Sequence, residues 1–294
     1  MDEYAIGVLT NVGLFSFVAL SAWLVLVAGE LSFGQQAFFG VGAYAAGICT
    51  AMLGWPLPLA VLAAMALGAA AAALVGLPTL RLRGLYFAMA TLAAAEMLRI
   101  LFELFHWQIA VGAEKVGPDG TQGFRGIRWM FERGFEPLDF LALVWMLLAG
   151  MVVILVLIEN SRLGVTIRAL GHDPDLARSA GIDVDRLKLG VVAAGGALAA
   201  LGGALFAHHN TYIEPRNFDI MLGVHSLAYG LIGGLGTVFG PLLGVMLDIG
   251  VLEAIRPLQE YRMIAFGGLV AVLLVFRPRG LLDEQAVHWL KSKL

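Results

Sequence analysis

The segment PLPLAVLAAMALGAAAAALVGLPTL, residues 56–80, decides the fold class of this chain. It contains apolar and small residues and no charge along its whole length. A bilayer core of about 30 Å is crossed by about 20 helical residues, because each residue of an α-helix advances the chain by about 1.5 Å. Residues 56–80 are therefore predicted to form a transmembrane helix.

Comparable segments occur along most of the chain. The uncharged ones are residues 5–28, 31–53, 140–158 and 189–207. Residues 84–105 are apolar except for three charged side chains, and residues 261–276 form the last apolar segment. The first segment follows the acidic leader Met1-Asp2-Glu3, whereas a signal peptide has a basic leader, so we expect it to remain as a membrane anchor.

The composition agrees with a chain that is dissolved in lipid. Hydrophobic residues make up 60% and charged residues only 14%, and the mean hydropathy is +0.84. Charged residues make up about 25% of an average soluble protein. The net charge of −3 gives no basic surface for nucleic acid, which excludes that partner. The single cysteine, Cys49, lies in an apolar run and is expected to be buried.

The segment 218–255 is too long for one transmembrane helix and slightly too short for two helices that cross the membrane without tilt. The sequence GGLGTVFGPLLG, residues 233–244, stands in the middle, so we expect two helical limbs that are broken at glycine. The count is then nine passes, or eight if one glycine-rich segment is re-entrant. The predicted fold is an all-α polytopic membrane helix bundle, with a single transmembrane domain over residues 1–294.

The basic residues predict the orientation, because short loops rich in Lys and Arg stay in the cytoplasm. They occur in three places, which are Arg81 with Arg83, the segment 159–188, and the C-terminal Arg277, Arg279, Lys291 and Lys293. Nine passes place all three in the cytoplasm when the N-terminus is outside and the C-terminus is cytoplasmic. Residues 106–137 then form an external loop, whose glycines indicate a turn-rich cap.

Two short motifs resemble nucleotide-binding signatures and are rejected. LSFGQQ, residues 31–36, lies within a membrane segment, and GVGAYA, residues 40–45, lacks the flanking strand that a dinucleotide-binding motif requires. No phosphate-binding loop of the form GxxxxGK(S/T) occurs, so the chain has no visible means of binding ATP. GVGAYA is better explained by close helix packing, as are Gly195, Ala199 and Gly202, whose contact is either internal or between subunits.

Few side chains in the membrane segments are polar enough for chemistry. His208 and His209 are adjacent, and adjacent histidines rarely bind one ion, so interface positions are favoured over metal binding. No nucleophile, base or metal set is present, and we expect a protein that is not an enzyme.

Glu96, Arg99 and Glu103 share one helical face because their spacings are three and four. They form either an intrahelical ladder of ion pairs or a polar wall of a solute pathway. Asp248 and His225, in the broken segment, are lesser candidates for such a wall.

Two apolar runs are interrupted by glycine, SFGQQAFFGVGAYAAG at 32–47 and LIGGLGTVFGPLLG at 231–244. Broken helices free backbone groups that must be satisfied in protein or at a cavity, and their N-termini attract carboxylates, although plain helix packing explains the glycines equally well. The residues that we expect along a substrate path are Gln35, Gln36, Tyr44, Glu96, Gly233, Gly234 and Thr237.

The predicted cytoplasmic loop, residues 159–188, contains the sequence of a short helix. Asp173 is suited to cap the N-terminus, Pro174 stands at the first helical position, and Gly181 ends the helix after Ala180. We expect a surface helix over 174–180 that binds a soluble partner. The residues of this expected coupling site are Asp173, Pro174, Asp175, Leu176, Ala177, Arg178, Ser179, Ala180 and Gly181.

This loop resembles the EAA-type coupling loop of permeases in ATP-binding-cassette (ABC) importers, with Arg178 and Ser179 departing from a literal EAA. Nearly the whole chain resembles one branch of that class, the LivM-type permeases of branched-chain amino acid importers. The matching strings are LSFGQQAFFGVGAY at 31–44, RLRGLYFAMATLAAAEMLR at 81–99, GTQGF at 120–124, SRLGVTIRALGHDPDLARSAGIDVDRLKL at 161–189 and GGLGTVFGPLLG at 233–244.

The resemblance implies a subunit of the bacterial inner membrane that is not catalytic. It implies a homologous second permease, two cytoplasmic ATPases that bind ATP and Mg²⁺, and an extracytoplasmic solute-binding protein. The expected cargo is a branched-chain or other hydrophobic amino acid. Two alternatives remain, namely a related importer of urea or short amides, and a proton-coupled secondary transporter that uses Glu96 or Asp248.

Overall fold

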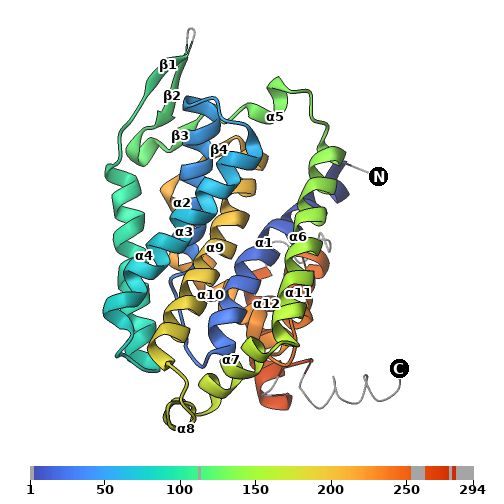
Figure 1. Ribbon diagram of the computed structural model, residues 1–294. Helices are drawn as coiled ribbons and strands as arrows, with labels where there is room; N and C mark the ends of the chain where they lie inside the picture. Colours follow the sequence, from blue (N-terminus) through green and yellow to red (C-terminus); the bar gives the residue numbers. More distant parts are fainter. Residues whose placement is uncertain (1–2, 112–113, 253–261, 278–279, 283–294) are drawn as a thin grey trace.

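The computed structural model describes residues 3–111, 114–252, 262–277 and 280–282. Within this part of the chain, five helices are long and apolar enough to cross a membrane. They are α1 (Glu3–Val27), α3 (Leu57–Thr79), α4 (Leu85–Leu104), α6 (Pro137–Glu159) and α9 (Val184–Asn210). The helices run along a common direction (Figure 1). The predicted helical bundle of apolar segments is therefore confirmed.

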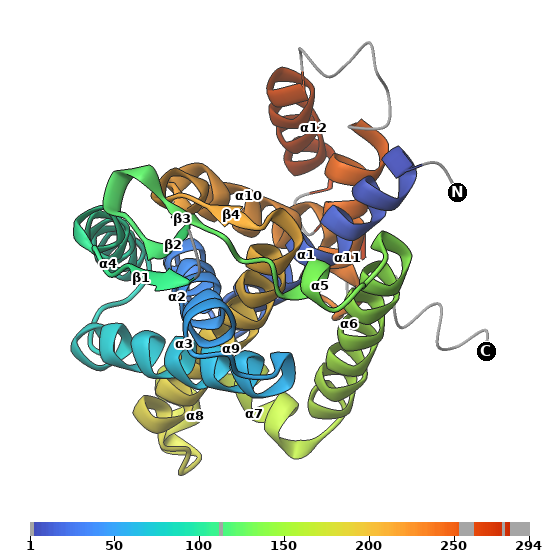
Figure 2. The same cartoon turned by 90° about the horizontal axis from the view of Figure 1, so that it is seen from above.

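Shorter helices complete the bundle. α2 (Gln35–Gly47) continues as the π-helix η1 (Ile48–Met52), and α11 (Phe239–Val245) continues as the π-helix η4 (Met246–Leu252). The remaining ones are η2 (Gly120–Gln122), α5 (Trp129–Glu132), α7 (Arg162–His172), α8 (Pro174–Ser179), η3 (Pro215–Phe218), α10 (Ile220–Gly233) and α12 (Arg262–Phe276). Seen from above, α4, α6 and α12 lie at the periphery (Figure 2).

The predicted segment 31–53 is helical only from Gln35 onward. Gly34 precedes the helix and no side chain caps it, so α2 begins with free backbone N–H groups. The predicted break in 218–255 is confirmed, because α10 ends at Gly233 and its C-cap Gly234 has a φ of 99°, in a region that L side chains rarely adopt.

Close packing around α9 depends on small residues. A Cβ added at Gly42 of α2 would collide with the carbonyl oxygen of Ala200, and one added at Gly203 would collide with that of Phe39. The backbones of α2 and α9 therefore touch, as small residues allow between membrane helices. This contact confirms the packing interpretation of GVGAYA.

The small-residue face of α9 is an internal contact with α1. A Cβ at Gly195 would stand 3.1 Å from the Val25 side chain, and one at Gly202 would stand 2.7 Å from the Cβ of Phe17. Ala199 between them is fully buried. The alternative that these three residues face another subunit is therefore wrong.

A small antiparallel sheet lies at one end of the bundle, where the sequence predicts only turns. Its order is β1-β2-β3-β4, formed by β1 (Ile109–Val111), β2 (Glu114–Pro118), β3 (Phe124–Arg125) and β4 (Tyr212–Ile213). Because β4 follows α9 directly, the sheet joins the segment 106–137 to the end of α9. The fold is therefore helical with a small sheet, and not all-α. Such short strands give no periodic sequence pattern.

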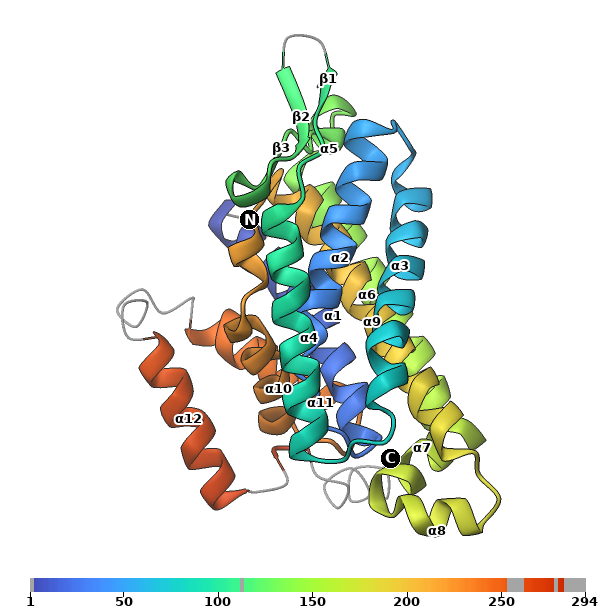
Figure 3. The same ribbon diagram turned by 90° about the vertical axis from the view of Figure 1, so that its left-hand side faces the viewer.

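The two ends of the bundle differ. The sheet, α5 and the start of α1 lie at one end, and α7 and α8 lie at the other (Figures 1 and 3). Below, these are the sheet end and the α8 end. The predicted last segment is α12, although Tyr261 lies outside the described residues, as do the C-terminal Arg279, Lys291 and Lys293.

Candidate functional site

The α8 end carries the short helix that the sequence predicts. Asp173 caps α8, because its Oδ1 accepts hydrogen bonds from the backbone N–H groups of Asp175 (2.9 Å) and Leu176 (3.0 Å). Pro174 occupies the first turn, where its missing N–H costs nothing. At the other end, Gly181 adopts a φ of 85°. The helix is confirmed, with Ser179 as its last residue and Ala180 as its C-cap.

One side of α8 packs on the bundle, and the other side is exposed. Leu176 is 67% exposed, and Ala180 is also exposed. Ala177 is only 3% exposed, so it packs on the chain's own bundle and cannot contact a partner. The Ser179 hydroxyl donates to the carbonyl oxygen of Leu176 within the helix (2.7 Å).

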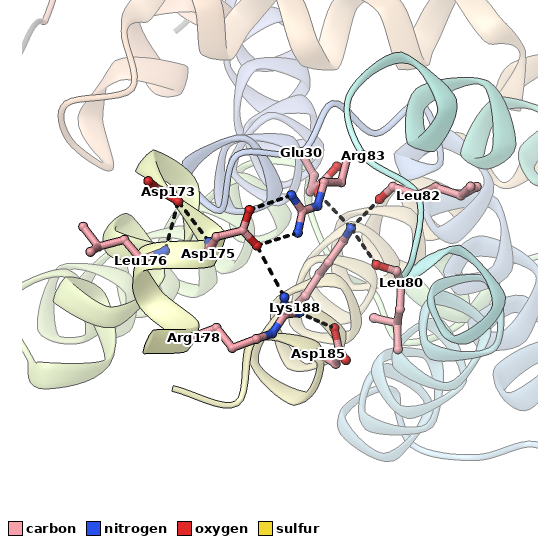
Figure 4. Close-up of polar contacts among 10 residues, drawn as sticks. All are labelled: Glu30, Leu80, Leu82, Arg83, Asp173, Asp175, Leu176, Arg178, Asp185 and Lys188. Carbon is pink, nitrogen blue, oxygen red and sulfur yellow. Dashed lines mark hydrogen bonds and ion pairs between the residues drawn. The ribbon is translucent and has the colours of Figure 1, made fainter. Parts of the chain in front are cut away.

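An ion pair fixes α8 to the loop between α3 and α4. The guanidinium of Arg83 donates two hydrogen bonds to the Asp175 carboxylate, at 3.1 and 3.3 Å, and Arg178 approaches the same carboxylate at 3.5 Å (Figure 4). The hydrogen bonds from Arg83 lower the pKa of Asp175, and those to Asp175 raise the pKa of Arg83. Both side chains are more than half exposed, so the pair orients α8 more than it stabilises the fold.

A second ion pair, between Lys188 and Glu30, is buried beneath α8. Lys188 Nζ lies 2.7 Å from Glu30 Oε1, and the two side chains are 5% and 10% exposed. The ammonium also donates to the carbonyl oxygens of Leu80 (3.3 Å) and Leu82 (2.9 Å) (Figure 4). It lies 4.6 Å from the centre of the Phe87 ring. One side chain at the start of α9 thus holds together the α1–α2 and α3–α4 loops.

α7 contacts two further loops. Arg168 Nη2 donates to Glu159 Oε1 (2.8 Å) and to the carbonyl oxygen of Gly236 (2.9 Å), and the N–H of Val238 donates to Glu159 Oε2 (3.3 Å). Gly236 and Val238 belong to the turn between α10 and α11. A Cβ at Gly171 of α7 would collide with the carbonyl oxygen of Val27, the last residue of α1, and would stand 3.1 Å from the backbone nitrogen of Gly29 in the α1–α2 loop. The segment 162–179 is therefore in contact with the α1–α2, α3–α4 and α10–α11 loops.

The residues expected along a substrate path fall into three groups. Gln35, Gln36 and Tyr44 lie on α2 and are at most 4% exposed. Glu96 lies on α4, with a half-exposed side chain. The third group, at the turn between α10 and α11, contains Gly233, Gly234 and Thr237.

The charged residues of α4 form the predicted intrahelical ladder. Arg99 Nε donates to both carboxylate oxygens of Glu96, at 2.9 and 3.0 Å, and Arg99 Nη1 donates to Glu103. The ladder of ion pairs is therefore present and matches the charge of Glu96 on its own helix, while the place of Glu96 along a substrate path stays a prediction.

The lesser candidates have partners within the bundle. Asp248 is fully buried and accepts a hydrogen bond from the Tyr229 hydroxyl (2.7 Å). The His208 ring contacts Thr50 Oγ1 (2.9 Å) and the carbonyl oxygen of Ala204 (2.7 Å), and His225 stacks on Phe266. In the described part of the chain, no group of three or more His, Cys, Asp and Glu side chains is placed to hold a metal ion. Cys49 is buried, as predicted.

Sequence reasoning did not find the contacts of Glu30, Glu159 and Arg168. Glu30 and Glu159 each stand at the edge of an apolar segment, where a charged side chain must find a partner or reach water, and Arg168 lies in the polar loop 159–188. That position was the available signal, but the partners are distant in sequence and a single sequence does not identify them.

Comparisons with known proteins identify related sequences. The family model described as "Branched-chain amino acid transport system / permease component" matches residues 4–276. The high-affinity branched-chain amino acid transport permeases LivM of Salmonella typhimurium and of Escherichia coli are each 30% identical to the chain over 302 residues, which cover 94% of this chain and 67% of theirs.

LivH of Salmonella typhimurium, a second permease protein of high-affinity branched-chain amino acid transport, is 30% identical over 152 residues, or 50% of this chain and 48% of its own. No solved structure gives a significant match. The family model covers most of the chain, and the LivM proteins match it nearly from end to end. The chain belongs to the family of permease components of branched-chain amino acid transport systems.

Proposed function

We propose that this chain is a permease subunit of an ABC importer and that it carries a branched-chain or other apolar amino acid across the bacterial inner membrane. Family membership and the LivM relatives support the class and the cargo. The similarity to LivH as well supports a homologous second permease as the partner across the path. The family also favours ATP-driven import over a proton-coupled secondary transporter.

The observation that carries the coupling role is the attachment of α8. The helix exposes Leu176 and Ala180, while its base is fixed by the Arg83–Asp175 pair. An exposed helix that is held rigidly against a bundle can transmit force from a soluble partner. We therefore assign the segment 173–181 as the docking element for an ATPase subunit, with ATP and Mg²⁺ bound by that subunit.

The segment 162–179 contacts three loops, through which a force from the ATPase subunit on α8 would be transmitted to the bundle. Arg83 carries it to the α3–α4 loop, the backbone contact of Gly171 carries it to the α1–α2 loop, and Arg168 carries it to the α10–α11 turn. Each loop joins two helices of the bundle. Movement of α8 on ATP binding would then shift several helices together. The bundle would switch between a state that is open to the outside and a state that is open to the cytoplasm.

The proposed orientation places the α8 end in the cytoplasm and the sheet end outside. The basic residues Arg81, Arg83 and Arg178 support it, because they gather at the α8 end and Lys and Arg in short loops stay inside. The solute-binding protein would dock on the sheet end, including residues 106–137. The nine-pass count follows when α2, α10, α11 with η4, and α12 each cross the membrane.

Reconstitution tests the proposed function. Proteoliposomes that contain this chain, the second permease and both ATPases, with loaded binding protein, should accumulate L-leucine only with ATP. Ala180→Arg should abolish uptake because it places a long cation at the docking surface, whereas Ala180→Ser should retain it. Accumulation by this chain alone under a proton gradient would overturn the proposal.

A further inference from the structure

Buried polar atoms that lack a partner are concentrated on one short stretch of the chain. Among the described residues, five buried side-chain nitrogen or oxygen atoms have no hydrogen-bond partner, and four of them belong to Glu30, Gln35, Gln36 and Tyr44. Native proteins satisfy nearly all buried polar groups, so an unpaired group needs an explanation. Several such groups on one helix indicate that α2 meets a polar ligand during the functional cycle.

Gln35 lies near the middle of the bundle. The Ser21 hydroxyl contacts the Gln35 amide and donates to the carbonyl oxygen of Gly195 (2.7 Å), about halfway along α9. From the α8 end, non-helical residues 31–34 lead the chain inward, and the N–H of Phe33 donates to Thr91 Oγ1 nearly two turns into α4 (3.1 Å). The uncapped N-terminus of α2 is therefore deep in the bundle, where its dipole favours a carboxylate.

The two glutamines offer complementary chemistry at this point. Gln35 is fully buried and Gln36 is 2% exposed, and each has one amide atom without a partner. An amide presents an N–H donor on one side and a carbonyl acceptor on the other. Such a pair beside a helix N-terminus suits a molecule that carries both a carboxylate and an ammonium group.

One face of α2 continues from this point toward the sheet end. Gln36, Gly40 and Tyr44 are spaced by four residues and so share a face. The Gln36 amide lies directly against Gly223 of α10, and a Cβ at Gly40 would stand 2.9 Å from Phe102 of α4. The face therefore lines a seam between α2, α4 and α10.

Three aromatic rings fill this seam on the sheet side of Gln36. Tyr44 stacks on Phe102 with the ring centroids 4.5 Å apart, and Phe218 packs edge-on against both, at 6.1 and 6.2 Å. We call Tyr44, Phe102 and Phe218 the aromatic layer. A Cβ at Gly40 would also stand 3.0 Å from Phe218, so the rings are packed directly on the helix backbone and must move for anything to pass.

We propose that this seam is a subsite for a zwitterionic amino acid with an apolar side chain. The amides of Gln35 and Gln36 at the N-terminus of α2 bind its carboxylate and ammonium groups. The aromatic layer packs on its side chain and closes the route to the sheet end in the state described here. The subsite rests on the proposed transport function and adds the residues that recognise the cargo.

The first test compares uptake with ATP hydrolysis in the complete reconstituted transporter. Gln36→Leu keeps the size of the side chain and removes the amide, so L-leucine uptake per ATP hydrolysed should fall about five- to tenfold, as expected for a lost hydrogen bond to cargo. Gln36→Asn should recover part of the loss. Thr50→Val is the matched control, because Thr50 is a buried polar residue of the same helix whose partners lie within the chain. Its uptake per ATP should stay near the wild-type value.

The second test measures access to the seam. Cys49 is the only cysteine of this chain, so Cys49→Ser removes the thiol that this chain contributes to the assembled transporter. In that background, Gln36→Cys should react with a small cationic methanethiosulfonate reagent faster during ATP turnover than at rest. Ala45→Cys, on another side of α2, should react slowly in both states.

These outcomes separate the subsite from the proposed function. If the wild-type transporter shows no ATP-driven uptake, the proposed function fails. The subsite alone is overturned if the wild-type transporter is active and Gln36→Leu has the same uptake per ATP hydrolysed. It is also overturned if ATP turnover does not change the reactivity of Gln36→Cys.

Discussion

Lys188 joins two loops at the α8 end through a buried ion pair. Its ammonium pairs with Glu30 in a buried environment and donates to two backbone carbonyl oxygens. Breaking a buried pair by removing one partner costs about 3–5 kcal/mol, because the other charge stays buried. Lys188→Met should therefore lower the thermal unfolding temperature of the purified chain in detergent. The double variant Glu30→Gln with Lys188→Met should recover part of the lost unfolding temperature. Equal unfolding temperatures for Lys188→Met and the double variant would contradict the pairing.

Gly203 provides a second test at the scale of one residue. A methyl group there would collide with the carbonyl oxygen of Phe39, so Gly203→Ala should separate α9 from α2 and cost about 1–3 kcal/mol. Gly190 lies on the same helix, and a Cβ added there would meet no atom within 4 Å. Gly190→Ala should be neutral or stabilise by up to about 1 kcal/mol. Thermal unfolding in detergent compares the two, and similar melting temperatures would refute the packing assignment.

At the scale of elements, the tether of α8 can be weakened without unfolding the bundle. Asp175→Asn and Arg83→Gln each remove the exposed ion pair between α8 and the α3–α4 loop. Each should reduce uptake per ATP while the melting temperature changes little. The double variant should be no worse than either single variant, because both remove the same contact. Additive losses would show that the residues act separately.

The same pair predicts the pH response. Arg83 lowers the pKa of Asp175, so the contribution of the pair is present above the ordinary carboxyl pKa near 4 and is lost as the pH falls through the lowered value. Between about pH 8 and pH 5, the wild-type coupling ratio should show no titration from this contact. A loss centred near pH 6 would assign the response to another group.

The elements also show what a single sequence can predict. The membrane-spanning helices can be predicted because a bilayer requires long uncharged segments. α8 can be predicted because Asp173, Pro174 and Gly181 are start and stop signals within the helix's own sequence. α7 is not expected, because its charges obscure the buried positions Ile167 and Leu170. The sheet is missed because its pairing joins Phe124 to Ile213 across five intervening helices, α5 to α9.

The candidate site is predictable only in part for the same reason. The sequence indicates which charges stand at the ends of apolar segments, but the pairing of Glu30 with Lys188 and of Arg168 with the α10–α11 turn depends on how distant segments pack. Likewise, the glycines of α2 and α10 indicate interruptions, whereas only the packed structure shows that one amide atom each of Gln35 and Gln36 lacks a partner.

At the scale of the whole molecule, the chain is a bundle whose loops at one end are joined through the segment 162–179. The exposed Leu176 lies on the surface where we propose that an ATPase subunit docks. The sheet end, which we propose as the docking surface of the solute-binding protein, lies at the opposite end from α8 (Figure 3). The seam beside α2 lies between the two ends, so movement of the loops at the α8 end can reach it through α1, α4 and α10.

The most direct test of the coupling role is site-specific photo-crosslinking in the assembled transporter. A benzophenone amino acid at position 176 should form a covalent adduct with an ATPase subunit, and the same group in place of Trp107, exposed at the sheet end, should not. An adduct at position 176 with lipid or the chain's own helices alone, in a complex that contains both ATPases, would contradict the assignment of α8 as the docking helix.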